Sequence, residues 1–260
     1  MYYLFMVSSP SRWSKAAVFA AILIGAVAGS GAAAENATLV LSTGMIAPWS
    51  NSDGTGFHQI LVRDVFARTG VQAKVDVNLA AARAFHLADD GVTDGLAGRV
   101  AGMEKEFPNL VRVPEPMFFN DFVACTAGPP PPQRWDELTS HGVAYIIGWQ
   151  IFERNLPTVR DLAVAKDAAQ LVGLLRIGRT EVILHERWQA LWQAKAMNQA
   201  IKCGETPLAR VPMYLYLNRR HEGLVDKVAV ELRRMKDDGS YQALAERVFG
   251  GLGASVTGVK

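Results

Sequence analysis

Residues 38–57 read TLVLSTGMIAPWSNSDGTGF, and this stretch carries the pattern from which the fold can be assigned. Its first five residues, 38–42, are mostly apolar, as expected of a buried strand. A loop rich in turn-forming residues follows as far as Gly56. From Phe57 to Val65 apolar residues recur every three or four positions, which predicts a helix. The stretch is therefore a strand, a long loop and a helix.

Strand and helix patterns continue to alternate along the chain. This alternation favours an α/β fold in which mixed sheets are flanked by helices. Further strands are predicted at residues 73–77, 95–98, 110–113, 122–126, 143–147, 181–184 and 213–217, and the clearest later helices at residues 80–87, 186–197 and 221–236.

Two segments divide this pattern into lobes. The run from Gly128 to Pro132 contains four consecutive prolines, which cannot donate hydrogen bonds to a sheet and favour a stiff, extended segment. We take it as one lobe boundary and residues 206–212 as the second crossing. The first lobe is then expected to comprise residues 35–126 and 208–260, and the second lobe residues 127–207.

A short unit occurs once in each expected lobe. A helix end is followed by Gly91, two residues, Asp94 and an apolar strand, and Gly178 and Glu181 stand in the same order further on. Chance or two related lobes would both produce such a repeat, because helix–glycine–strand units are common in α/β proteins. At Glu181 we expect a structural role at the start of the strand.

The N-terminus is typical of a secretory signal peptide covering residues 1–34. Arg12 and Lys15 precede an apolar run of about 13 residues, and Ala32–Ala34 offer a cleavage site before Glu35. The alternative, an uncleaved membrane anchor, would need about 20 apolar residues. We therefore expect a mature, exported protein in the periplasm.

The charge balance argues against nucleic acid as a partner. The chain has 27 basic and 25 acidic residues, and removal of the expected signal peptide, with Arg12 and Lys15, leaves 25 of each. Nucleic-acid binding through a general electrostatic field usually needs a clear basic excess.

The two cysteines, Cys125 and Cys203, would face an oxidising compartment after export, where disulfides persist. A Cys125–Cys203 disulfide and two buried free thiols are both compatible with the sequence.

The sequence lacks the common catalytic and metal-binding motifs, so it gives no support for an enzyme. There is no G-x-S-x-G, no phosphate-binding G-x-x-x-x-G-K-[ST] and no H-E-x-x-H. We expect no metal, no cofactor and no enzymatic activity, although a catalytic pair assembled only in space remains the alternative.

Several short motifs resemble the family 3 extracellular solute-binding proteins, which have the type II periplasmic binding-protein fold. The matching segments are GMIAPW at 44–49, GF at 56–57, GVTDG at 91–95, FPNLVRVPEP at 107–116, GRTE at 178–181 and MKDDG at 235–239. The resemblance implies a monomer of two α/β lobes joined by two crossing segments, with a small ligand held between them for an ABC-type permease. A sensory input to a membrane receptor is the rival function.

The chain departs from the amino-acid-binding members of that family. They usually carry a carboxylate-binding arginine about twelve residues after the aspartate of the G-x-x-D motif, and Glu106 stands there instead. An acid common early in the first helix is replaced by His58. We therefore expect a small polar, anionic ligand, with amino acids as one alternative.

Three candidate ligand contacts are expected in the first lobe. Arg99 follows a small-residue strand, and ligands bind beyond the carboxyl ends of strands in open α/β sheets. Its guanidinium fits a carboxylate, although an ion pair with Glu104 or Glu115 is the structural alternative. Trp49 is expected to stack on the ligand or to anchor its loop, and Phe118 to face either the ligand or the core.

The second lobe is expected to contribute Gly148, Trp149 and Gln150. These residues follow a buried strand and open a short helix, whose N–H groups could bind an anion. Core packing is the alternative for Trp149.

Overall fold

A computed structural model describes residues 38–78, 81–256 and 259, which belong to one compact unit spanning residues 36–260. The expected signal peptide, residues 1–34, lies outside the described residues. None of the helices within the described ranges has the length and apolar character needed to cross a bilayer.

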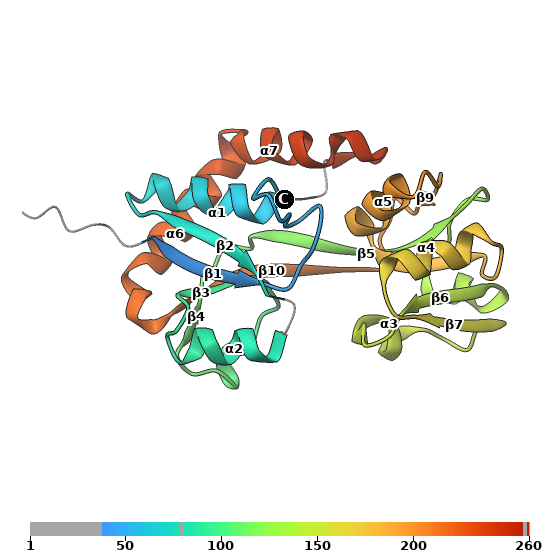
Figure 1. Cartoon of the computed structure of the whole chain (residues 1–260), viewed down its shortest axis with the longest axis horizontal. Coiled ribbons are helices and arrows are strands. Elements are labelled where there is room, and N and C mark those ends of the chain that lie inside the picture. The colour runs from blue at the N-terminus through green and yellow to red at the C-terminus, as the bar shows by residue number, and fades with distance from the viewer. Residues whose placement is uncertain (1–37, 79–80, 257–258, 260) are drawn as a thin grey trace, which may run out of the picture. The chain divides into compact units, whose positions relative to one another are not determined.

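Ten strands and seven α-helices are defined in these ranges (Figure 1). The strands are β1 (Leu39–Thr43), β2 (Ala73–Val77), β3 (Gly95–Arg99), β4 (Leu110–Arg112), β5 (Phe118–Thr126), β6 (Gly142–Ile146), β7 (Asp161–Ala165), β8 (Val182–Glu186), β9 (Lys202–Cys203) and β10 (Ala209–Asn218). The helices are α1 (Phe57–Arg68), α2 (Ala81–Asp89), α3 (Gln150–Asn155), α4 (Ala168–Arg176), α5 (Arg187–Ala196), α6 (Glu222–Asp237) and α7 (Ser240–Phe249), with 3₁₀ turns at Met103–Lys105, Trp135–Ser140, Arg219–His221 and Gly250–Leu252.

All strands belong to one mixed sheet, which confirms the predicted α/β class. The strand order is β2-β1-β3-β10-β5-β8-β6-β7, with β4 paired to β10 and β9 paired to β5. Strands β2, β1 and β3 are parallel in the first lobe, and β8, β6 and β7 are parallel in the second. The long antiparallel strands β5 and β10 join the two groups, and they are the crossing segments (Figure 1).

The main differences between the predicted and the observed strands concern β5, β7, β9 and β10. The strand predicted at 122–126 begins earlier, at Phe118, and the segment predicted as a crossing at 206–212 contributes its second half to β10. Residues Ala209–Met213 pair in register with Phe118–Phe122, because the crossing is itself a strand pair. Strand β7 was not predicted, although four of its five residues are apolar; in the structure it is an edge strand whose Leu162 and Val164 are exposed.

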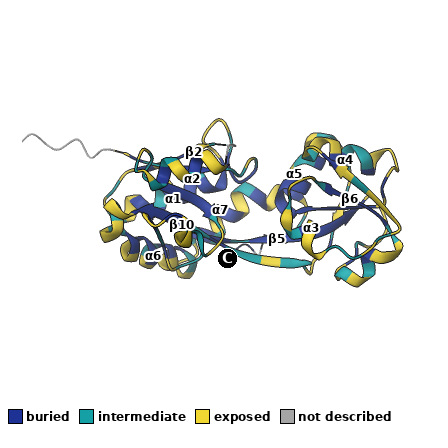
Figure 2. Ribbon diagram, turned by 90° about the horizontal axis from the view of Figure 1, so that it is seen from below, coloured by how far each residue is buried: buried dark blue, intermediate teal, exposed yellow. Residues whose placement is uncertain are grey.

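Apolar side chains fill both faces of the sheet, while the outer faces of the helices stay exposed (Figure 2). The largest cluster lies under α1, α6 and α7, and a smaller one lies under α2 on the opposite face of the first lobe. Helix α6 shows the helical pattern expected from its sequence, with Val225, Val228, Leu232 and Met235 buried. Two further clusters lie in the second lobe.

Helix α5 follows a second-lobe strand but also packs into the core of the first lobe. Its Trp188 ring stacks on Phe249 of α7 with a centroid distance of 4.7 Å. At the start of the helix, the buried Glu186 accepts a hydrogen bond of 2.9 Å from Nε1 of the buried Trp49. The two lobes are therefore joined by a buried polar contact as well as by β5 and β10.

Glu186 is fully buried and caps α5. Its carboxylate accepts hydrogen bonds from the backbone N–H groups of Trp188 and Gln189, at 3.1 and 2.9 Å. Burial raises the pKa of Glu186 to about 7, and the three donors only partly offset that cost.

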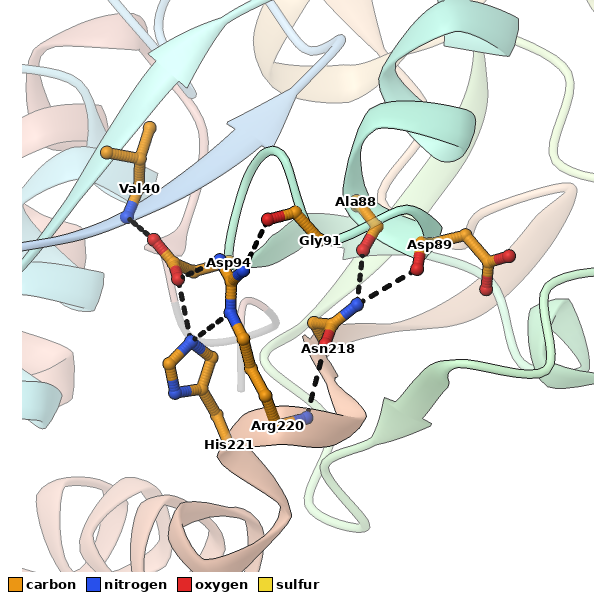
Figure 3. A network of polar contacts seen from close by, with 8 residues as sticks. All are labelled: Val40, Ala88, Asp89, Gly91, Asp94, Asn218, Arg220 and His221. Atoms are coloured by element: carbon orange, nitrogen blue, oxygen red, sulfur yellow. Dashed lines mark hydrogen bonds and ion pairs between the residues drawn. The ribbon is translucent and has the colours of Figure 1, made fainter.

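The two repeated acids hold the first strand of each lobe in the same way. Asp94 accepts from the backbone N–H of Val40 at 2.7 Å and pairs with Arg220 and His221 (Figure 3). Glu181 accepts from the N–H of Gly142 at 3.2 Å and pairs with Arg160 at 2.9 Å. The structural role expected at Glu181 is confirmed.

Cys125 and Cys203 form a disulfide in the structure, which is one of the two alternatives left open by the sequence. The two cysteines are register partners on β5 and β9, so the bond joins the crossing strand to the chain that returns towards β10.

We predict that Asp94→Ala lowers the free energy of unfolding by about 1–3 kcal/mol, because it leaves the Val40 N–H without an acceptor. Glu181→Ala should cost clearly less than Asp94→Ala, since its side chain is 51% exposed and exposed ion pairs contribute little. Urea unfolding of both variants tests this. Equal losses would contradict it.

Reduction of the disulfide should destabilise the protein by about 2–4 kcal/mol, because the bond closes a loop across 78 positions. The measurement is a urea melt of the native protein against the Cys125→Ala/Cys203→Ala double variant. Coincident melts would show that the bond contributes nothing.

Glu186 should make stability depend on pH. The folded pKa of about 7 lies above the ordinary value of 4.5, so its contribution is complete below about pH 4.5 and is lost as the pH rises to 7. Between these values, unfolding free energy should fall by up to about 3 kcal/mol relative to Glu186→Gln. The exposed Glu205→Gln is the control and should follow the native curve. Parallel curves for native protein and Glu186→Gln would refute the assignment.

Candidate functional site

Arg99 is the last residue of β3 and lies beside the end of β1. Its guanidinium is centred 4.7 Å over the ring of Phe85, in a cation–π contact. A side chain at Gly44 would crowd it, because a Cβ built there lies 3.3 Å from Nη2 of Arg99. The glycine after β1 therefore leaves room for the arginine at the carboxyl edge of the sheet.

The guanidinium of Arg99 lacks the partners that a buried charge normally has. Its Nε and Nη2 atoms are buried and have no hydrogen-bond acceptor among the described residues. Burial also lowers the pKa of Arg99. Glu104 accepts from the hydroxyl of Tyr216, and Glu115 pairs with Lys236, so neither carboxylate provides the alternative ion pair. A cation in this state is electrostatically suited to an incoming anion.

His58 lies near Arg99 but adds no charge to the site. The imidazole is fully buried, and its Nε2 atom has no partner among the described residues. Burial and the Arg99 charge lower the pKa of His58 to about 3. The ring is therefore neutral near pH 7, and Arg99 carries the positive charge of this corner.

The expected ligand contacts at Trp49 and Phe118 are wrong. Both side chains are fully buried, and their rings pack 4.2 Å apart. The loop folds back because the N–H of Phe57 donates to Pro48 and that of His58 to Trp49, which carries the indole over α1. Trp49 is the loop anchor that the sequence left as the alternative, and Phe118 belongs to the core.

The anion site expected at Gly148, Trp149 and Gln150 stays a prediction, although the N–H group of Gly148 is already bonded within the chain. The chain's own Glu153 carboxylate accepts the Gly148 N–H at 2.8 Å, so an acid already lies at the start of α3. The Trp149 ring packs 4.7 Å from His185 and 5.9 Å from Phe122, as expected of core packing. Gln150 alone remains exposed at a groove.

That groove has a volume of about 340 Å³ and lies between the crossing strands, α3 and the residue after Arg99. Its lining includes Val100, Asn120, Phe122, Ile151, Val211 and Met213. The sequence alone does not mark these residues as ligand contacts, whereas Gln150, which also lines the groove, was predicted as one. Alternation along β5 could have placed Asn120 and Phe122 on one face, but not beside α3.

Buried titratable groups elsewhere do not form a metal centre. His185 is fully buried, and burial lowers its pKa to about 3. Its Nδ1 accepts the N–H of Glu186. Across the described ranges, no cluster of three or more His, Cys, Asp or Glu side chains could hold a metal ion.

Sequence comparisons give little information about this chain. No protein-family profile matches it. An uncharacterised protein of Shewanella oneidensis is 22% identical over 200 residues, covering 71% of this chain and 72% of that protein.

Similar solved structures include three proteins of the same architecture. The GluR0 ligand-binding core in complex with L-glutamate has a TM-score of 0.66 and 15% identity, covering 83% of this chain and all of that one. The unliganded, open L-cystine receptor of Neisseria gonorrhoeae has a TM-score of 0.65 and 20% identity, covering 83% and 94%. A histidine kinase sensor domain similar to periplasmic binding proteins has a TM-score of 0.61 and 15% identity, covering 82% and 96%. The chain therefore has the two-lobed fold of the type II periplasmic binding proteins.

Proposed function

We propose that this protein is a periplasmic solute-binding protein that captures a small anion. The solute binds between the first lobe, residues 35–126 and 208–260, and the second lobe, residues 127–207. The single observation that supports this most is the buried guanidinium of Arg99, two of whose nitrogen atoms have no acceptor in the described part of the chain.

Buried guanidinium nitrogen atoms without an acceptor cost stability in the empty protein. A binding site can retain such nitrogen atoms where a ligand supplies the missing acceptor, because an anion then forms charge-assisted and often bidentate hydrogen bonds with the guanidinium. Arg99 stands at the carboxyl end of β3, where ligands bind in open α/β sheets. Its position and its missing partners support the same function.

Hinge closure is the mechanism that this proposal implies. Two lobes joined by crossing strands can close around a ligand, and contacts made only in the closed form shift the population towards it. The similar L-cystine receptor is described as open without ligand, and the similar GluR0 core was solved with L-glutamate. Both ligands carry carboxylates, which is consistent with a guanidinium in the site.

Delivery to an ABC-type permease is the leading role, and a sensory input to a membrane receptor is the second. The structural similarity to a histidine kinase sensor domain supports the sensory role as an alternative. Co-purification from membranes with a permease subunit or with a receptor distinguishes the two. Turnover of the captured solute would instead indicate an enzyme.

The ligand class can be tested by thermal shift of the mature protein. The panel contains monocarboxylates, dicarboxylates, amino acids, inorganic phosphate and small organic cations. A ligand at 100 times its dissociation constant should stabilise the folded state by about 2.7 kcal/mol. We expect stabilisation by anions and none by the cations.

Arg99→Ala should weaken binding of any anion found in this way by roughly 30-fold or more, since loss of one partner of a buried charge pair costs about 2–5 kcal/mol. Arg99→Lys should restore only part of it, because lysine lacks the planar fork. Isothermal titration measures both. Arg83→Ala, on the exposed side of α2, is the matched control and should bind normally.

The melting temperature without ligand separates binding from structure. Because Nε and Nη2 of Arg99 have no acceptor among the described residues, the gain from removing them should offset the lost contact with Phe85, and Arg99→Ala should melt at the same temperature as the native protein or higher. A lower melting temperature with unchanged affinity in the folded protein would show that Arg99 is structural, and a cationic solute would then become the better hypothesis.

A further inference from the structure

The groove that reaches Val100, the residue directly after Arg99, would limit the kind of anion that can bind. Its walls are apolar side chains of the crossing strands and α3, chiefly Phe122, Val211, Met213 and Ile151. Val100, the residue directly after Arg99, forms part of the same wall. A volume of about 340 Å³ falls at the lower end of the range for small-molecule sites. An inorganic anion would leave this apolar surface uncovered.

Three exposed polar side chains of α3 also line the groove, namely Gln150, Arg154 and Asn155, and Asn120 adds one buried polar atom. Asn120 lies on β5 and is only 6% exposed, and its Oδ1 atom has no hydrogen-bond donor within the described residues. Leaving a buried acceptor unpaired is costly, so a ligand donor at this point would gain a full hydrogen bond. The groove therefore selects a solute that carries an N–H or O–H group.

The charges around the groove indicate that this donor is neutral. The groove lining described here contains no Asp or Glu. Asp121, the next residue along β5, lines a separate cavity and lies 3.6 and 3.8 Å from Arg187 and Arg210. Glu186 already accepts three N–H donors. A ligand ammonium group would thus find no available carboxylate, and its desolvation would be uncompensated.

A second negative charge on the solute is also disfavoured. The one cation in the described lining is Arg154, whose side chain lies on the exposed side of α3. An exposed guanidinium gains little from an ion pair in water. A second carboxylate on the solute would therefore gain much less stabilisation in the groove than the first carboxylate gains from Arg99.

From these features we infer that the solute is an amphiphilic hydroxy acid or a similar monocarboxylate with a neutral donor, rather than a zwitterionic amino acid. Its carboxylate binds Arg99, its apolar body covers Phe122, Ile151 and Val211, and its O–H or N–H donates to Asn120. This inference rests on the proposed function, in which Arg99 binds the anion.

The test uses ligands that differ at one group. Isothermal titration compares 3-phenyllactate, phenylalanine and 3-phenylpropionate, with both enantiomers of the chiral pair, and adds succinate and inorganic phosphate. We expect phenyllactate to bind at least about 10-fold more tightly than each of the others, because only it combines one charge, an apolar body and a neutral donor.

Asn120→Ala provides the second readout. This variant should bind phenyllactate and phenylpropionate equally well, and the binding of both ligands should still depend on Arg99. A merely structural role of Asn120 would not remove the preference in this selective way. Asn109→Ala, an exposed amide on the turn before β4, is the matched control and should keep the preference. Thermal melts confirm that each variant is folded.

The possible failures are distinct. Tighter Arg99-dependent binding of phenylalanine, succinate or phosphate would overturn the inference and leave the proposed function standing. A preference for phenyllactate that survives Asn120→Ala would overturn the role of Asn120. Absence of Arg99-dependent binding for every anion in the wider panel would refute the proposed function and this inference with it.

Discussion

The antiparallel pairing of β5 with β10 is the contact on which both lobes depend. Five consecutive register pairs, from Ala209↔Phe122 to Met213↔Phe118, join the two strands where the chain passes between the lobes. The disulfide and the Trp49–Glu186 hydrogen bond both involve elements next to this pair. Because the same strands also form one wall of the groove, changes in hinge geometry and changes in ligand contact are coupled.

Asp94 and Arg99 lie on one short stretch of chain but have opposite environments. Asp94, at the amino end of β3, is bonded to Val40, Arg220 and His221, and these contacts fix the start of the sheet (Figure 3). Arg99, at the carboxyl end, has buried nitrogen atoms with no acceptor among the described residues. Satisfied polar groups support the fold at one end of β3, and polar atoms without a partner among the described residues lie at the other end.

The site could be predicted from sequence only in part. Periodicity placed Arg99 at the end of a strand of small residues, and it is the last residue of β3 in the structure. Trp49 and Phe118 were assigned wrongly, since an aromatic residue in a loop or at a strand end can face either way. Gly148 and Gln150 were placed correctly on a strand–helix turn, but the sequence did not show that Glu153 folds back onto that turn. Asn120 was missed because its unpaired oxygen exists only once β5, β10 and α3 are assembled.

The sequence by itself determined the class of fold, the order of most strands and helices, and the repeated acid at the start of a strand in each lobe. These depend on local periodicity and on contacts within single β-α units, which short segments specify. The tertiary structure decided which polar groups are paired, because partners such as Trp49 and Glu186 are 137 positions apart. It also decided that the cysteines meet and that the groove is apolar, since burial depends on packing between segments that are remote in the chain.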